Sequence, residues 1–189
     1  MHPGNWLHLE GGRKNQRELA LDVMVYCIDK MLPRFSTLDL DVHIGNYTTT
    51  EGIMGSCMHQ HDNICEIKLD KHQDHYNLIR TTCHEMVHVK QYVRKELTDK
   101  RLGYPPYLVN MWKGKQHTDR RCEPWEREAW DMETLLAHDY IKNHTIPSLT
   151  QFTESALLIG DNIRINQIPE CVYLFVKIPK SSKNAQSTD

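Results

Sequence analysis

The chain has 189 residues, which is enough for one ordinary domain and too short for two. Its 23 basic residues nearly balance its 25 acidic residues, so its charge gives no indication of a nucleic-acid or anionic-membrane partner. No run of about eighteen apolar residues exists, and residues 1–13 lack the apolar core of a signal peptide, so we expect a cytoplasmic protein.

The first predicted elements are one helix and two strands. Residues 15–32 carry apolar side chains at helical spacing, and Pro33 ends the pattern. Residues 38–44 alternate apolar and polar side chains, which is typical of a strand with one solvated face. Residues 63–69 indicate another strand, which follows a polar turn at residues 59–62. We expect an α+β fold in which a small, mostly antiparallel sheet packs on the N-terminal helix.

Residues 84–88 read His-Glu-Met-Val-His, an HExxH sequence inside a helix predicted over residues 76–92. Positions i and i+4 of an α-helix lie on the same face, so His84 and His88 can hold one metal ion with Glu85 beside it. Apolar residues occupy more of this helix than one stripe needs, which indicates burial on most sides. The motif predicts a zinc site, and the alternative is a hydrogen-bonded pair of core histidines.

Two histidines leave a catalytic zinc site one protein ligand short, and His2Glu is an established ligand set. Residues 124–140 predict a helix that begins at Pro124 and has acidic side chains in its first turn. The apolar stripe of this helix places Glu126 and Glu128 on opposite flanks. The pattern alone allows either carboxylate to reach the metal.

The order of three motifs resembles a group of small, mostly uncharacterised metallopeptidases encoded by bacteriophages and related bacterial elements. The motifs are HExxH, then WKGK at residues 112–115, then PWEREA at residues 124–129. The resemblance covers about residues 55–137. It implies a zincin-like fold, zinc as cofactor, a protein or peptide substrate and, for a phage protein, the host cytoplasm as location. In zincins an edge strand beside the metal pairs with an extended substrate, and the resemblance assigns that role to residues 64–69.

The resemblance also bears on the third ligand. In ImmA/IrrE-like proteins and membrane-associated gluzincins, the ligand glutamate lies three residues before a small residue, in an ExxA arrangement. This arrangement implies Glu126, with Ala129 as the small residue, rather than Glu128. An aspartate commonly follows that alanine and supports the site, but Trp130 stands here. Two nearby acids are the candidates for the supporting role, Asp131 and Glu133.

Other histidines and tyrosines offer alternatives. His117 is the alternative third ligand, in the manner of SprT-like proteases, but the PWEREA match would then be unexplained. His117, Tyr104 or Tyr107 could instead donate to an oxyanion, while a surface histidine and packed tyrosines are the competing interpretations. A second metal site is disfavoured because no ligand pattern is complete. Its four histidines would be His59, His61, His72 and His75.

The remaining patterns are structural. Residues 107–112 predict a strand, and Gly114 predicts a hairpin turn after it, so we interpret the WKGK motif as a hairpin rather than a nucleic-acid patch. Residues 152–159 predict a short helix and residues 171–178 a strand. We therefore expect one domain over residues 1–178 and a flexible tail over residues 179–189.

The cysteines indicate a reducing compartment. Six are present without a CxxC pair, and several fall inside predicted helices or strands. Such cysteines are more often small buried hydrophobic side chains than disulfides or metal ligands. The six are Cys27, Cys57, Cys65, Cys83, Cys122 and Cys171.

These patterns predict a zinc metallopeptidase. His84, His88 and Glu126 would hold the metal, and Glu85 would take a proton from a zinc-bound water and pass it to the leaving amine. One alternative is a zinc hydrolase of a non-protein amide of the cell-wall type. Another is a zincin scaffold that binds a partner around a structural zinc. Glu85 favours the enzyme, since a structural site has no need of a base.

Overall fold

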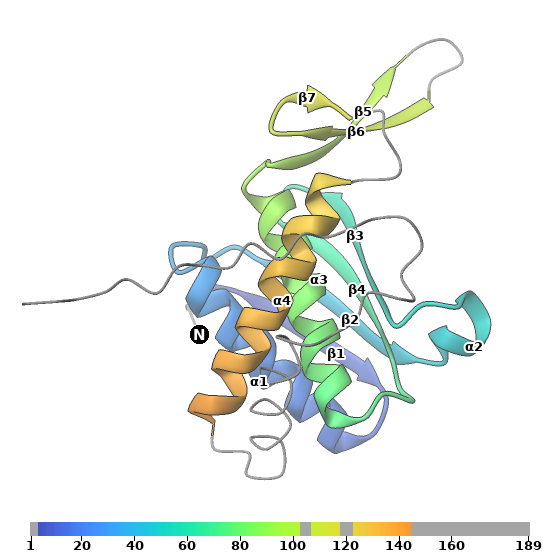
Figure 1. The fold of residues 1–189 in the computed structure, drawn as a ribbon, viewed down its shortest axis with the longest axis vertical. Helices are drawn as coiled ribbons and strands as arrows, with labels where there is room; N and C mark the ends of the chain where they lie inside the picture. Colours follow the sequence, from blue (N-terminus) through green and yellow to red (C-terminus); the bar gives the residue numbers. More distant parts are fainter. Residues whose placement is uncertain (1–3, 103–106, 118–122, 145–189) are drawn as a thin grey trace, which may run out of the picture.

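The computed structural model describes residues 4–102, 107–117 and 123–144. The predicted short helix, C-terminal strand and flexible tail lie outside these ranges, as do Tyr104, Cys122 and Cys171. The described residues form an α+β fold of helices and two small sheets, as the sequence predicts (Figure 1). Within them, no helix is both long and apolar enough to cross a membrane.

The larger sheet has four strands in the order β1-β2-β4-β3. They are Trp6–Gly11 (β1), Asp39–Gly45 (β2), Gly55–His61 (β3) and Ile64–Asp70 (β4). The prediction of a mostly antiparallel sheet is wrong, because β2 runs parallel to both β1 and β4, and only β3 and β4 are antiparallel. The helix α1 (Lys14–Met31) provides the long crossover that two parallel strands require. Alternation of apolar residues shows that a strand exists but not its direction.

The edge of the sheet also differs from the prediction. The segment expected to be a polar turn contains the end of β3, and the turn is confined to Asp62 and Asn63. Asp62 has a φ of 48°, the left-handed conformation that a two-residue hairpin turn needs. The β4 strand is therefore internal, and β3 is the edge strand that packs beside the helix carrying HExxH. Its Ser-Cys-Met-His-Gln-His sequence has no regular apolar alternation, which is why the pattern did not reveal it.

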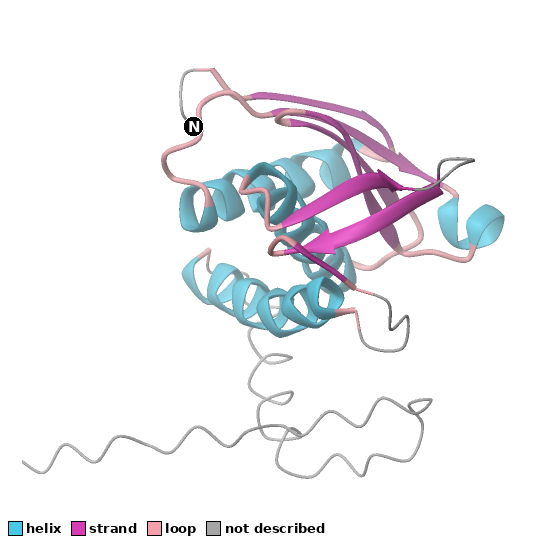
Figure 2. Cartoon of the chain, turned by 90° about the horizontal axis from the view of Figure 1, so that it is seen from above, coloured by secondary structure: helices cyan, strands magenta, loops and turns pink. Residues whose placement is uncertain are grey.

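Three long helices lie on one side of this sheet, and the third of them packs on the other two rather than on the strands (Figure 2). They are α1, α3 (His75–Val93) and α4 (Pro124–Asn143), and all three predicted helices are confirmed. The apolar residues of β2 and β4 line up in register and face the helices, as in the pairs Leu40 with Cys65 and Val42 with Ile67. The α3 helix contacts the sheet, α1 and α4, so it is buried on most sides, as predicted.

A second sheet of three strands extends from one end of the helices (Figure 1). Its strands are Leu97–Leu102 (β5), Tyr107–Trp112 (β6) and Lys115–Gln116 (β7). The predicted strand and its glycine turn are confirmed, whereas β5 was not predicted. Lys113 and Gly114 have φ values of 48° and 78°, the pair of left-handed residues typical of a type I′ turn. A short helix, α2 (Tyr47–Glu51), follows β2.

The four described cysteines are free thiols, and three of them are fully buried. Cys27 and Cys83 face each other from α1 and α3 with their sulfur atoms 3.9 Å apart. Cys65 is buried in β4, and Cys57 is partly buried in β3. The expectation that they act as small hydrophobic side chains is confirmed for the buried three.

Candidate metal centre

Two helices bring three ligand atoms together. The α3 helix aligns His84 and His88 on one face, and their Nε2 atoms are 3.2 Å apart. The first turn of α4 supplies Glu126, whose carboxylate oxygens lie 3.3 Å from Nε2 of His84 and 3.4 Å from Nε2 of His88. Within the described residues, this is the one group of three or more His, Cys, Asp or Glu side chains arranged to hold a metal ion.

The group is compact enough for one metal ion. One ligand atom from each of the three residues lies within 4.8 Å of the others, and each histidine Nε2 faces a different oxygen of the Glu126 carboxylate. Two histidines and one glutamate are a donor set that suits zinc, and they would leave one position of a tetrahedral ion open, as in catalytic zinc sites.

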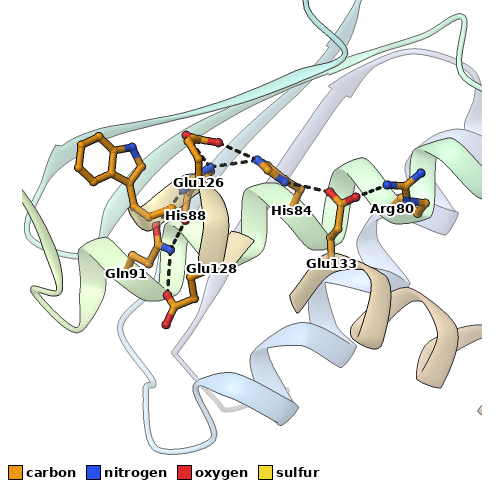
Figure 3. A network of polar contacts seen from close by, with 8 residues as sticks. Arg80, His84, His88, Gln91, Glu126, Glu128 and Glu133 are labelled. Atoms are coloured by element: carbon orange, nitrogen blue, oxygen red, sulfur yellow. Dashed lines mark hydrogen bonds and ion pairs between the residues drawn. The ribbon is translucent and has the colours of Figure 1, made fainter. Parts of the chain in front are cut away.

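The hydrogen bonds behind both histidines turn the same nitrogen toward the centre (Figure 3). Nδ1 of His84 lies 2.9 Å from Oε2 of Glu133, and Nδ1 of His88 lies 2.9 Å from Oε1 of Gln91. Both oxygens only accept hydrogen bonds, so each Nδ1 carries a proton and each Nε2 is the atom that faces Glu126. When both imidazoles are neutral, each Nε2 has a lone pair, and a cation between these atoms and the carboxylate would remove their mutual repulsion.

The orientation of the Gln91 amide is fixed by its other contacts. Its Nε2 atom donates to the carbonyl of Trp125 and to Oε2 of Glu128, each at 2.9 Å. Since both partners are acceptors, Oε1 must be the atom that faces His88. Sequence reasoning missed Gln91, although its position three residues after His88 places both side chains on one face of the helix.

Glu133 is the acid that supports His84, and it was one of the two candidates. It is buried, whereas Asp131 is exposed on the same helix. Oε1 of Glu133 accepts a hydrogen bond from Nη2 of Arg80. Burial alone would raise the pKa of Glu133, but the contacts with His84 and Arg80 lower it, so the carboxylate stays ionised.

Glu128 lies on the other flank of α4, as the periodicity predicts. It accepts hydrogen bonds from Nζ of Lys90 and from Gln91, both at 2.9 Å, and does not belong to the metal-binding group. Burial would raise its pKa, but these two contacts lower it. Glu128 is therefore placed to support Gln91, and Glu126 is the carboxylate that faces the histidines.

Without a metal, the centre binds protons strongly. Burial would lower the pKa of His84, but hydrogen bonds to Glu126 and Glu133 raise it to about 9. The pKa of His88 is raised in the same way against its burial, mainly by Glu126. Burial would raise the pKa of Glu126, but the two histidines lower it to about 2. These pKa shifts have a common cause: the negative charge of Glu126 stabilises a positive charge on the histidines, and the histidines stabilise the ionised form of Glu126.

Glu85 is buried next to the histidines but is not part of the candidate metal-binding group. Glu85 is 4% exposed. Burial raises the pKa of its carboxyl group to about 7, although His88 and His84 act to lower it. A side chain at Gly55 of β3 would collide with it, because an added Cβ would lie 2.7 Å from Oε1 of Glu85 and 2.5 Å from Cγ2 of Thr81. Gly55 thus keeps space beside Glu85, where a pocket of about 400 Å³ opens.

The alternative third ligand, His117, lies away from the centre, and the two candidate tyrosines are not among the described side chains. The ring of His117 packs against Trp125, with ring centroids 5.5 Å apart, and His117 is not in the metal-binding group. Tyr104 and the side chain of Tyr107 fall outside the described residues. Among the residues that the structure describes, no predicted oxyanion donor therefore lies at the centre.

None of the four histidines considered for a second metal site belongs to a candidate metal-binding group among the described residues. His59 stacks on Tyr92 with ring centroids 4.9 Å apart, and its Nε2 lies 3.1 Å from the Asp62 carbonyl oxygen. Nε2 of His72 lies 2.8 Å from Oδ1 of Asn46. These two histidines each have a local partner in a different part of the fold.

Comparisons of this chain with protein-family models, with curated proteins and with solved structures give no match. The interpretation of the centre therefore depends on the residues and distances given above.

Proposed function

We propose that this chain is a zinc-dependent metallopeptidase with a zincin-like fold that acts on a protein or peptide in the cytoplasm. The observation that carries the proposal is the convergence of His84, His88 and Glu126, with one ligand atom of each within 4.8 Å of the others, beside the buried Glu85, which is outside that group. A structural zinc site would have no use for Glu85, so this acid favours an enzyme over a binding scaffold.

Each residue of the centre has its own role in the proposed hydrolysis. A zinc ion held there would lower the pKa of a coordinated water to about 7 and polarise a substrate carbonyl. Glu85 takes up the proton released as the carbonyl is attacked and delivers it to the leaving nitrogen. The burial of Glu85 beside both histidines places its carboxylate where it can exchange a proton with a water bound at the centre. Glu133 and Gln91 keep both imidazoles correctly oriented.

The position of β3 supports a peptide substrate over a cell-wall amide. Within the described residues, β3 pairs with β4 on one side and has no strand on the other. It also packs against α3 and begins at Gly55, beside Glu85. An extended peptide can add to such an edge through main-chain hydrogen bonds, which a non-peptide substrate cannot supply in the same pattern. The role assigned to residues 64–69 by resemblance thus passes to β3.

The test compares the wild type with Glu85→Gln. Both proteins should bind one zinc ion, while peptide cleavage falls by about a hundredfold to ten-thousandfold in the variant because the base is lost. Glu18→Gln, on the exposed surface of α1, is the matched control and should keep full activity. Equal cleavage by the wild type and Glu85→Gln, or no zinc in the wild type, would contradict the proposal.

A further inference from the structure

The pocket beside Glu85 has an uneven lining. Apolar walls come from Ile53, Met54 and Trp130, and the last two are about half exposed. The polar side chains come mainly from one face of α3 and from Glu133 of α4. Among the described residues that line the pocket, Arg80 is the one Lys or Arg side chain.

Arg80 retains hydrogen-bonding capacity toward the pocket. Its guanidinium has five N–H groups, and the hydrogen bond to Glu133 uses Nη2 alone. The side chain is 40% exposed, and its guanidinium also lies 5.9 Å from the ring centroid of Tyr76. A guanidinium can bridge two carboxylates, since its planar fork binds a second one through two parallel hydrogen bonds.

The existing contacts leave donors rather than acceptors free for a substrate. Arg80 and Glu133 cancel each other formally, and Glu133 has both oxygens occupied, by His84 and by Arg80. A zinc ion held by two neutral histidines and Glu126 would keep one positive charge, and Glu85 offsets that charge when it is ionised. Arg80 therefore offers donors to a substrate anion, whereas Glu133 offers no free carboxylate oxygen to a substrate cation.

The position of Arg80 relates this charge to the scissile bond. Arg80, His84 and His88 follow one another at four-residue intervals, so they form one stripe of α3. Four residues of helix rise about 6 Å, and an extended peptide advances about 3.3 Å per residue, so Arg80 and His84 are separated by roughly two residues of substrate. Figure 3 shows Arg80 beyond Glu133, on the side of His84 away from Glu126.

The geometry points to Arg80 as a specificity-determining residue that binds a substrate carboxylate within about two residues of the scissile bond. This inference rests on the proposed peptidase function. The carboxylate belongs either to an Asp or Glu side chain or to the C-terminus of the substrate, and both present the same chemistry to Arg80. Ile53, Met54 and Trp130 pack against the carbon atoms of that residue.

The experiment measures binding of three peptide hydroxamates to the zinc-loaded full-length protein by calorimetry. The first has Asp beside the zinc-chelating group and an amidated C-terminus, the second has Asn in its place, and the third has Asn and a free C-terminal carboxylate. The wild type should bind the first or the third about tenfold to a hundredfold more tightly than the second, as expected for a charge-assisted hydrogen bond. The preferred probe identifies which carboxylate is recognised.

Variants of Arg80 separate recognition from support of Glu133. Arg80→Gln should abolish the ratio between the carboxylate and Asn probes, and Arg80→Lys should keep part of it, because lysine retains the charge but not the fork. Arg34→Gln removes the same charge from an exposed position outside the pocket lining and should keep the full ratio. The ratio of probe affinities is compared rather than each affinity alone. Weaker zinc binding would lower the affinity of all three probes equally and leave the ratio unchanged.

Two outcomes would overturn the inference alone. One is tight, zinc-dependent binding of all three probes by the wild type with equal affinity, and the other is a full ratio in Arg80→Gln. Absence of zinc from the wild type would overturn the proposed function and this inference together. Zinc content is measured on each sample before titration, so the two failures are distinguishable.

Discussion

The two histidines of the centre are supported in different ways. His84 donates to Glu133, a carboxylate that comes from another helix and is itself paired with Arg80. His88 donates to Gln91, a neutral amide on its own helix, one turn later. The first support comes directly from α4, while the second comes from α3 itself and is only oriented by contacts with α4.

This difference makes the two sides of the centre unequal in charge. A carboxylate partner makes the opposite nitrogen of an imidazole more electron-rich than an amide partner does, so His84 would be the stronger ligand of a bound metal. His84 also lines the pocket, whereas His88 does not. The charged support therefore lies on the pocket side of the centre, and the neutral support lies away from the pocket.

The largest expected effect comes from the residue that both histidines share. Glu126→Ala removes the anionic ligand and should weaken zinc binding by more than about a hundredfold, beyond the usual loss of an outer partner. Glu128→Ala removes only a partner of Gln91 and Lys90, so its loss should be much smaller. Competition with a chelating dye measures both affinities. Loss of zinc in Glu128→Ala alone would show that the assignment of the third ligand is wrong.

An intermediate effect is expected when the charged support is made neutral. In Glu133→Gln the amide oxygen can still accept from His84, but the amide nitrogen then faces the donor of Arg80. Zinc affinity should fall about tenfold to a hundredfold, the usual cost of altering an outer partner. Asp131→Asn, which removes the same charge from an exposed position of α4, is the matched control. An unchanged affinity in Glu133→Gln would mean that the two supports are equivalent.

The sequence predicted the parts of this centre that depend on local spacing. The two histidines, Glu85 and the flanks occupied by Glu126 and Glu128 all follow from helical periodicity. Glu133 was one of two candidates, because periodicity alone did not identify the acid that would meet His84. That choice depends on how α4 crosses α3, which is a property of tertiary packing.

Two of the missed strands share one physical cause. The β3 and β5 strands have mixed polar sequences, and hairpin pairing with β4 and β6 forms them rather than an apolar pattern of their own. The β1 strand was missed as well, although Leu7 and Leu9 in it alternate with polar residues. Strand direction was also wrong, since the parallel pairs of β2 depend on crossovers distant in sequence. Arg80 was missed because its significance comes from a contact with α4 and from the pocket beside it.

The smallest expected effect comes from Gly55→Ala, which alters the pocket beside Glu85 and none of the three proposed ligands. In Gly55→Ala the new methyl group would lie 2.7 Å from Oε1 of Glu85 and 2.5 Å from Cγ2 of Thr81, so one of them must move. A displacement of the base by a fraction of an ångström to about 1 Å should lower the cleavage rate roughly tenfold to a hundredfold. Zinc affinity should stay unchanged, because neither histidine nor Glu126 is touched.

Gly52→Ala separates this steric effect from a general loss of stability. Gly52 has a φ of 71°, so an alanine there is strained, but no atom lies within 4 Å of its added Cβ. It should lower the free energy of unfolding by about 1 kcal/mol and leave the cleavage rate unchanged. If both variants lost rate in proportion to their stability, Gly55 would be a structural glycine only. A rate loss in Gly55→Ala at equal zinc content would instead show that β3 sets the position of the base, and that the substrate side of the centre is defined by the sheet edge as well as by α4.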